Sequence, residues 1–203
     1  MKEIIFGLTL LTSLISFGEV PGSTEHIEPG AFSSLISLEQ VDLSNASSPT
    51  TPTECFQFAE LENDIIITAY FQWRGDECTK DVSIPSHING KRVTTIGYKA
   101  LNELGLTSLK LPNTITLIEG YACSQNNIKD LVIPSSVIFI GYGAFLNNPQ
   151  LSKLTLSGQL KVISNRAFRD TNLSTIEVFH LTQENSDSFD DDVEIVKKYT
   201  REF

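Results

Sequence analysis

The chain has 203 residues, of which 40% are hydrophobic, so it is long enough and apolar enough to form one domain with a continuous core. Its 25 Asp and Glu residues outnumber its 15 Lys and Arg residues, which gives a formal net charge of -10. This charge repels a polyanion, so nucleic acid is not expected as a partner. The same charge suits a cationic partner, and it also keeps a repeat protein soluble when no partner is present.

The N-terminal residues have the pattern of a secretory signal. Lys2 precedes an apolar run from Ile4 to Ile15, and small residues at the end of the run suit cleavage after Gly18. We therefore expect residues 1–18 to be a signal peptide and the mature chain to be secreted or to lie at the cell surface or in the periplasm. The alternative is that residues 8–14 form the apolar strand of a repeat coil. The run is too short and too interrupted for a membrane span, and no span is expected in the mature chain.

From Val93 onward the sequence repeats one pattern at intervals of 22 or 23 residues. An isoleucine, an alanine and a large apolar residue recur in register: Ile96, Ala100 and Leu101; Ile118, Ala122 and Cys123; Ile140, Ala144 and Phe145; Ile163, Ala167 and Phe168. Each coil also has a pair of apolar residues that are separated by one residue, which is polar in three of the four coils: Leu109 and Leu111, Leu131 and Ile133, Leu154 and Leu156, Ile176 and Val178. Such alternation predicts a short strand with one buried face. Because a single coil cannot bury its apolar side, the repeat predicts a solenoid of stacked coils over residues 84–178.

Three segments lie between the expected signal peptide and the predicted solenoid. Residues 19–44 contain part of a coil, with Ala31 and Phe32 at the alanine and large apolar positions. Residues 45–54 are rich in Ser, Thr and Pro and are interpreted as a linker. Residues 55–83 contain two strand-like runs around a polar turn, which predicts a β-hairpin that caps the stack.

The C-terminal segment, residues 179–203, is acidic and then amphipathic. Val193, Val196 and Tyr199 lie at helical spacing, which predicts a short capping helix at the far end of the core.

No motif in the sequence predicts catalysis. There is no nucleophile motif, no phosphate loop and no dinucleotide fingerprint. The three histidines and three cysteines have no metal-ligand spacing, so no metal, no cofactor and no enzymatic activity are predicted. The acidic run Asp190–Asp192, with Asp187 and Glu194, lacks the spacing of an EF-hand, and a solvated acidic turn is the preferred interpretation over a calcium site.

The cysteines have two different expected roles. Cys55 and Cys78 bracket the predicted hairpin, and we hypothesise that a disulfide between them pins its open end; the alternative is two free thiols. Cys123 falls at the large apolar position of its coil and is interpreted as a core residue.

The pattern resembles the BspA-like, or Treponema-type, leucine-rich repeat family. Residues 56–178 have this resemblance over nearly their whole length, including DIIITAY (64–70) and VSIPSHINGKRVTTIG (82–97), and residues 20–43 match more loosely. The resemblance implies a β-rich α/β fold, a right-handed leucine-rich-repeat solenoid of about four to five coils. It also implies a sheet of short strands on one side, short helical turns on the other, and a role in adhesion or protein contact at the cell surface. It implies no catalytic residues and names no ligand.

The positions of the predicted strands that are expected to point outward are the candidate partner-binding face. They form two columns: Ser108, Asp130, Lys153 and Thr175; and Lys110, Val132, Thr155 and Glu177. A third column, Leu117, Phe139 and Val162, is an interface if it points outward and core if it points inward, and core is the preferred interpretation.

Arg74, Gly75 and Asp76 spell an integrin-recognition tripeptide in a predicted loop. Gly and Asp are also ordinary turn residues, and turn chemistry is the preferred interpretation.

Two functions from different classes fit the sequence. The first is an exported binding or adhesion module that presents its repeat face to a protein partner. The alternative is a structural envelope or spacer protein that self-associates through the hairpin or the tail. The ligand and the oligomeric state stay open.

Overall fold

The structure is a computed structural model that describes residues 50–156, 160–179, 182–185 and 187–198. The expected signal peptide and partial coil, residues 1–18 and 19–44, lie outside the described residues, as does the first half of the linker, residues 45–49. The described residues belong to one unit that spans Ser47–Phe203.

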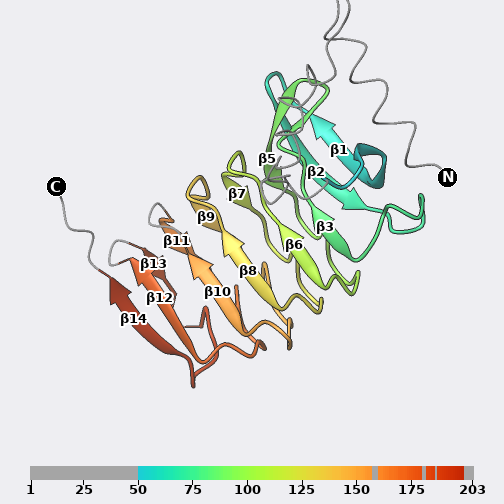
Figure 1. Cartoon of the computed structure of the whole chain (residues 1–203). Helices are drawn as coiled ribbons and strands as arrows, with labels where there is room; N and C mark the ends of the chain where they lie inside the picture. The colour runs from blue at the N-terminus through green and yellow to red at the C-terminus, as the bar shows by residue number, and fades with distance from the viewer. Residues whose placement is uncertain (1–49, 157–159, 180–181, 186, 199–203) are drawn as a thin grey trace, which may run out of the picture. The chain divides into compact units, whose positions relative to one another are not determined.

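Short strands stack into two walls, and each coil contributes one strand to each wall (Figure 1). The first wall is an eight-stranded sheet with the order β1-β2-β5-β7-β9-β11-β13, and β4 pairs with β5. Its strands are β1 (Phe56–Glu60), β2 (Asp64–Tyr70), β4 (His87–Ile88), β5 (Lys91–Ile96), β7 (Leu117–Ile118), β9 (Phe139–Ile140), β11 (Val162–Ile163) and β13 (Gln183–Glu184). This arrangement confirms the predicted β-rich solenoid.

The second wall consists of three parallel pairs, β3 with β6, β8 with β10, and β12 with β14. Its strands are β3 (Asp81–Ser83), β6 (Ser108–Lys110), β8 (Asp130–Ile133), β10 (Lys153–Leu156), β12 (Thr175–Phe179) and β14 (Glu194–Lys198). Figure 1 shows them as one row of arrows. The pairing is parallel because each strand returns after one full turn of the coil.

The apolar columns of the repeat form a core between the walls. Ile96, Ile118, Ile140 and Ile163 are fully buried, and so are Phe145 and Phe168. The rings of Phe145, Phe168 and Phe189 lie in one stack, with centroids 5.2 and 5.4 Å apart. Cys123 occupies the same column, and its burial raises the pKa of the thiol above the ordinary value.

The connections after the first wall are turns without a continuous helical hydrogen-bond pattern, whereas the resemblance implied short helical turns. In the turns that follow β5, β7, β9 and β11, two residues have positive φ, such as Tyr121 at 55° and Gln125 at 57°. A left-handed residue at every fourth position prevents the continuous right-handed dihedrals of a helix. Among the described residues the only helical element is the 3-10 turn η3 (Thr53–Cys55).

Two buried asparagines tie these turns together. The side-chain oxygen of Asn126 accepts hydrogen bonds from the backbone N–H groups of Leu104 and Leu106, at 3.1 and 3.0 Å. Its amide nitrogen donates to the carbonyls of Leu101 and Cys123, at 2.8 and 3.0 Å. Asn148 occupies the same position in the next coil and donates to Cys123 and Phe145. Each asparagine therefore satisfies backbone groups of two coils that would otherwise be buried without partners.

The expected C-terminal helix is wrong, because β13 and β14 belong to a further coil. Gln183 and Glu184 pair with Val162 and Ile163, and β14 pairs in parallel with all of β12. A strand is favoured here because β12 presents unpaired backbone groups and because Ile195 and Val196 are β-branched.

The predicted hairpin is joined to the stack and is closed by a disulfide. β1 pairs antiparallel with β2, and β2 pairs in parallel with β5. The sulfurs of Cys55 and Cys78 are bonded. No helix in the described part of the chain is long and apolar enough to cross a membrane.

Candidate functional site

The expected partner-binding residues lie together on the outer surface of the second wall. Ser108 is half-buried, and the other seven residues are exposed. The parallel register places Lys153 beside Asp130 and Thr155 beside Val132. We call this surface the strand face: Ser108, Lys110, Asp130, Val132, Lys153, Thr155, Thr175 and Glu177.

The neighbouring strands extend the strand face at both ends. Asp81 and Ser83 of β3 pair with Ser108 and Lys110, so they continue the two columns. At the other end Glu194 and Val196 of β14 pair with Thr175 and Glu177. Sequence reasoning missed β14 here because the segment had been assigned to a helix.

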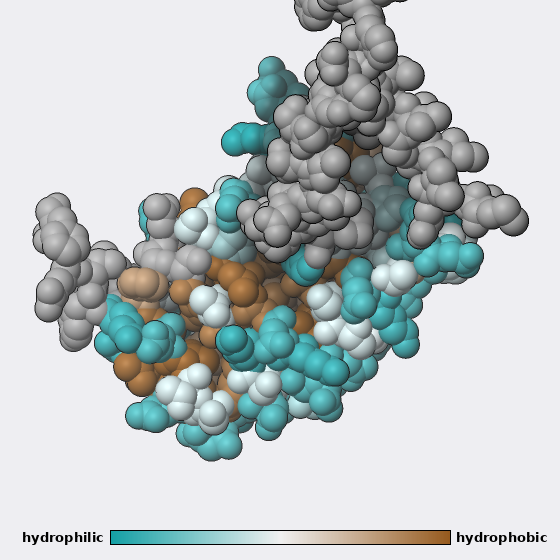
Figure 2. Space-filling model, viewed as in Figure 1, coloured by the Kyte–Doolittle hydropathy of each residue, from teal (hydrophilic) through white to brown (hydrophobic). Residues whose placement is uncertain are grey.

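The strand face mixes charges of both signs around one apolar residue. Val132 is 60% exposed at the centre of its column. Glu177 forms an ion pair with Lys198 at 2.9 Å, and the Asp81 carboxylate accepts a hydrogen bond from Thr107 at 2.6 Å. Figure 2, viewed as in Figure 1, shows hydrophobic and hydrophilic residues side by side on one side of the molecule. Protein interfaces have a similar arrangement of an apolar centre and a polar rim.

A groove of about 620 Å³ lies at the β3 end of the strand face. Asp81, Ser83, Ser108 and Lys110 line it from the strands, and Thr50–Pro52, Glu77 and Thr79 line it from the flanking loops. Cys78 lies between Glu77 and Thr79, so its disulfide restrains the loop that carries both residues. The groove is within the size range of ligand pockets.

The backbone groups on the free edge of β3, beside this groove, already have hydrogen-bond partners within the chain. Thr51 donates its N–H to the Ser83 carbonyl at 3.0 Å, and its hydroxyl accepts from the Ser83 N–H at 2.8 Å. The Thr79 hydroxyl accepts from the Asp81 N–H at 3.2 Å. These bonds occupy the backbone groups of β3 that an added strand would need.

The third apolar column points outward from the first wall, against the preferred interpretation. Leu117, Phe139 and Val162 are half-buried, whereas the residue that follows each of them is fully buried. Successive residues of a strand point to opposite sides, and the isoleucines take the inward positions.

Three tyrosines on consecutive coils form a second outward feature, which we call the tyrosine ridge: Tyr98, Tyr121 and Tyr142. The Tyr121 ring contacts both neighbours, with centroids 6.1 Å from Tyr98 and 5.4 Å from Tyr142. Sequence reasoning missed the ridge, although the recurrence of Ile-Gly-Tyr at residues 96–98 and 140–142 is a signal for it.

The sequence matches the family model of the BspA type leucine rich repeat region over residues 10–100 and 75–195, in 6 copies. The chain belongs to this BspA-type family. No curated protein matches the sequence.

Solved structures of leucine-rich repeat proteins resemble this member of the BspA-type family. A protein from Bacteroides capillosus is 22% identical with a TM-score of 0.47, and the match covers 74% of this chain and 99% of that one. The pneumococcal vaccine antigen PcpA is 15% identical with a TM-score of 0.48 over 71% of this chain and 46% of that one. A leucine-rich cell surface protein from Faecalibacterium prausnitzii is 20% identical with a TM-score of 0.39 over 75% and 55% of the two chains.

The Arg74-Gly75-Asp76 loop follows the hairpin, and the Arg74 side chain packs against other residues of the protein. The Arg74 guanidinium lies 4.2 Å from the centroid of the Phe71 ring, and it donates to the Glu54 carbonyl at 3.2 Å. An integrin-type role stays a prediction, and it requires Arg74 to leave both partners. The preferred interpretation, a turn, agrees with the hydrogen bond from the Cys78 N–H to the Gly75 carbonyl at 3.0 Å.

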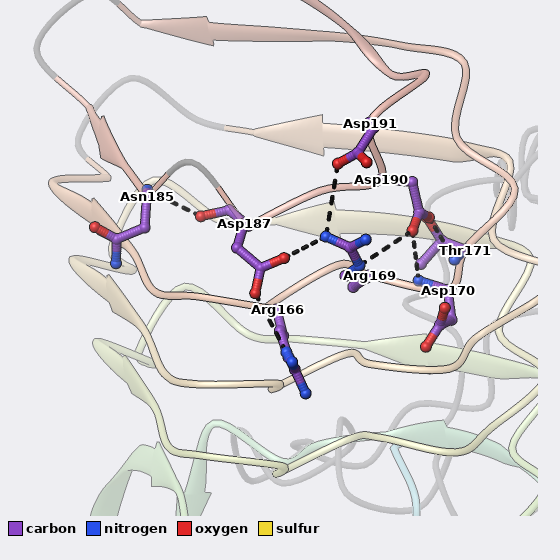
Figure 3. A network of polar contacts seen from close by, with 9 residues as sticks. Arg166, Arg169, Asp170, Thr171, Asn185, Asp187, Asp190 and Asp191 are labelled. Carbon is purple, nitrogen blue, oxygen red and sulfur yellow. Dashed lines mark hydrogen bonds and ion pairs between the residues drawn. The ribbon is translucent and has the colours of Figure 1, made fainter.

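The acidic residues of the last coil gather around two arginines (Figure 3). Asp187 pairs with both Arg166 and Arg169, and Arg169 also lies 3.9 Å from Asp190 and 3.7 Å from Asp191. The pKa of each arginine is raised, chiefly by its hydrogen bond to Asp187. In this BspA-type chain the carboxylates thus lock the last coil onto the one before it. Within the described residues no group of His, Cys, Asp and Glu has a metal-binding arrangement.

Proposed function

We propose that the chain is a surface-displayed binding module that holds a protein partner against the strand face, and that it acts by binding without catalysis. The observation that carries this proposal is the parallel register, which holds exposed side chains from successive strands in two fixed columns that end at a groove. No residue of the strand face or the groove needs to take part in a reaction for this role.

The rigidity of the strand face supports a binding role. Its side chains extend from strands whose inward residues are packed in the core, such as Leu131 between Asp130 and Val132. A surface that is already ordered loses little conformational entropy when a partner docks. The columns alternate acidic, basic and small residues, and this pattern favours a specific partner over nonspecific attraction.

Two further observations support display outside the cell. The disulfide between Cys55 and Cys78 is typical of proteins in oxidising compartments. Proteins similar in fold include one named as a cell surface protein and one named as a vaccine antigen. The expected signal peptide agrees with this location.

Capture of a partner from cell-surface extracts by matched variants of the full chain tests the proposal. Lys153→Glu reverses a charge on the strand face, and Val132→Asp removes its central apolar contact. Lys161→Glu is the control, because Lys161 is also an exposed lysine but lies just before β11 of the first wall. Circular dichroism of each variant checks that the fold is unchanged.

The proposal predicts saturable capture that Lys153→Glu and Val132→Asp abolish and that Lys161→Glu preserves. High salt is expected to weaken capture, because charged pairs are screened. Equal loss in all three variants, or no loss in any, contradicts the strand face as the site. A chain that self-associates and captures nothing would support the structural alternative.

A further inference from the structure

In the tyrosine ridge, the positions of tyrosine and glycine are swapped from one coil to the next. Tyr98 and Tyr142 lie two residues after their isoleucines, where the intervening coil has Gly120. That coil supplies its ring one residue later, from Tyr121. Gly143 makes room for it, because a Cβ on Gly143 would lie 2.9 Å from Cε1 of Tyr121. The three rings therefore interlock.

The ridge is exposed and yet held in place. Tyr98 is 59% exposed and Tyr142 is 41% exposed. The Tyr121 ring meets the Tyr98 ring edge-on, at 88° between planes, and meets the Tyr142 ring at 60°. The Tyr98 N–H donates to the Glu119 carboxylate at 2.7 Å, which fixes the turn that holds this ring. Tyrosines restrained in this way supply contact area at a low cost in conformational entropy.

The spacing along the ridge fits a polyproline II helix. Adjacent coils are about 4.8 Å apart because their strands are hydrogen-bonded, so the equivalent residues Tyr98 and Tyr142 are about 9.6 Å apart. A polyproline II helix has three residues per turn and a rise of about 3.1 Å, so its residues i and i+3 are about 9.3 Å apart on one face. In an extended strand the residues on one face are about 6.8 Å apart, which is shorter than the distance between Tyr98 and Tyr142.

The positive charge of Lys99 at one end of the ridge favours an acidic residue at the flank of such a peptide. The Lys99 ammonium lies 5.5 Å from the ring centroid of Tyr98 and 5.8 Å from that of Tyr121. Within the described part of the chain no carboxylate lies at ion-pairing distance from Lys99. Arg166, toward the other end, is engaged by Asp187 at 3.2 Å. The Lys99 end therefore offers a cation to an acidic side chain.

We propose that the tyrosine ridge binds a proline-rich peptide in the polyproline II conformation, with prolines at i and i+3 over Tyr98 and Tyr142 and an acidic residue beside Lys99. Aromatic side chains are the usual platform for such helices, whose carbonyls are free to accept hydrogen bonds from tyrosine hydroxyls. The site is separate from the strand face and does not depend on the function proposed for it.

Calorimetric titration of the full chain with synthetic peptides tests this proposal. The probe contains Glu-Pro-Ala-Ala-Pro, the first control peptide has alanine in place of both prolines, and the second has lysine in place of glutamate. Tyr98→Ala and Tyr142→Ala remove the platform, and Lys99→Ala removes the cation. Trp73→Ala is the matched control, because Trp73 is an exposed aromatic residue outside the ridge.

The probe is expected to bind, and each tyrosine variant is expected to weaken binding at least about tenfold. Lys99→Ala is expected to weaken the probe but not the lysine peptide, and Trp73→Ala is expected to change nothing. The proposal is wrong if the probe does not bind, or if the peptide without proline binds equally well. It is also wrong if a soluble glycan or a folded protein occupies the ridge and the proline-rich probe does not displace it. Thermal unfolding of every variant checks the fold.

Discussion

Phe145 and Phe168 lie face to face in consecutive coils, with ring centroids 5.2 Å apart and planes that differ by 4°. Phe189 continues the stack on the other side of Phe168. One aromatic column thus links the last three coils through the core, and Phe168 is its middle member.

Phe168→Ala is expected to destabilise the chain by about 3 to 5 kcal/mol, because it leaves a cavity and removes contacts on both sides of the ring. Urea unfolding followed by circular dichroism measures the effect. Trp73→Ala, which removes an exposed aromatic ring, is the control and is expected to change stability little. Equal effects of the two substitutions would show that the stack does not hold the coils together.

Asn126→Ala is expected to cost about 3 kcal/mol, because it leaves backbone groups of Leu101, Leu104 and Leu106 buried without partners. The adjacent Asn127 is exposed and provides the matched control as Asn127→Ala. The measurement is the free energy of unfolding in urea. A loss below that of the control would mean that water replaces the side chain.

Reduction of the disulfide is expected to lower stability by about 3 kcal/mol, because a closed loop of 23 residues restricts the unfolded chain. It is also expected to loosen the wall of the groove, measured as faster amide exchange at Glu77 and Thr79. The double variant Cys55→Ala and Cys78→Ala should behave like the reduced protein and be insensitive to reductant. A reduced chain as stable as the oxidised one would contradict this role.

Alkaline pH is expected to destabilise the chain through Cys123. Burial raises the pKa of this thiol, so the folded state keeps its proton while the unfolded state loses it above about pH 8.5. The unfolded state then binds fewer protons, and stability falls by about 1.4 kcal/mol per pH unit above that value until the folded thiol ionises. Burial also raises the pKa of Tyr70, to about 12, which adds to the loss above about pH 10. Stability measured against pH for Cys123→Ala is expected to lack the slope between pH 8.5 and 10, and an unchanged slope would assign it to other groups.

Arg169→Gln is expected to release the last coil, because Asp187, Asp190 and Asp191 then lose their shared cation. Hydrogen exchange should accelerate in β13 and β14 and stay unchanged in β7 and β8. Arg92→Gln, which removes an exposed ion pair with Asp64, serves as the control. Uniform acceleration along the chain would contradict a local lock.

The repeated columns of the core could be predicted because the packing repeats with the sequence. The positions of Ile96, Ala100 and Leu101 recur every 22 or 23 residues in the next coils, and each set is buried. The outward columns followed from the alternation of the strands, which is why the expected face lies together on the second wall.

The last coil was missed because its residues no longer share the chemistry of the repeat. Glu184 pairs beside Ile163, and Ser188 takes the place of an alanine. Glu184 also lies 21 residues after Ile163, one fewer than the shortest preceding interval. Phe189 is an exception, because it continues the column of Phe145 and Phe168. The backbone pairing that completes the coil depends on a neighbour that is distant in sequence.

The groove and the tyrosine ridge escaped prediction for a related reason. At the groove Thr51 and Ser83 are joined by one backbone hydrogen bond and one to the Thr51 hydroxyl, and their segments share no sequence pattern. The ridge depends on a glycine in one coil that accommodates a ring from another, as Gly143 does for Tyr121. Such complementarity between coils is not visible in the periodicity of either one.

The parallel register of β8 and β10 has a consequence for how such a chain can evolve. Asp130 and Lys153 are neighbours only because one complete coil separates them. Duplication of a whole coil at this point adds one strand to each wall and recreates the same junction on both sides of the insertion. The number of contact positions can therefore change through gene duplication while the disulfide-closed start and the arginine-locked end keep their structures.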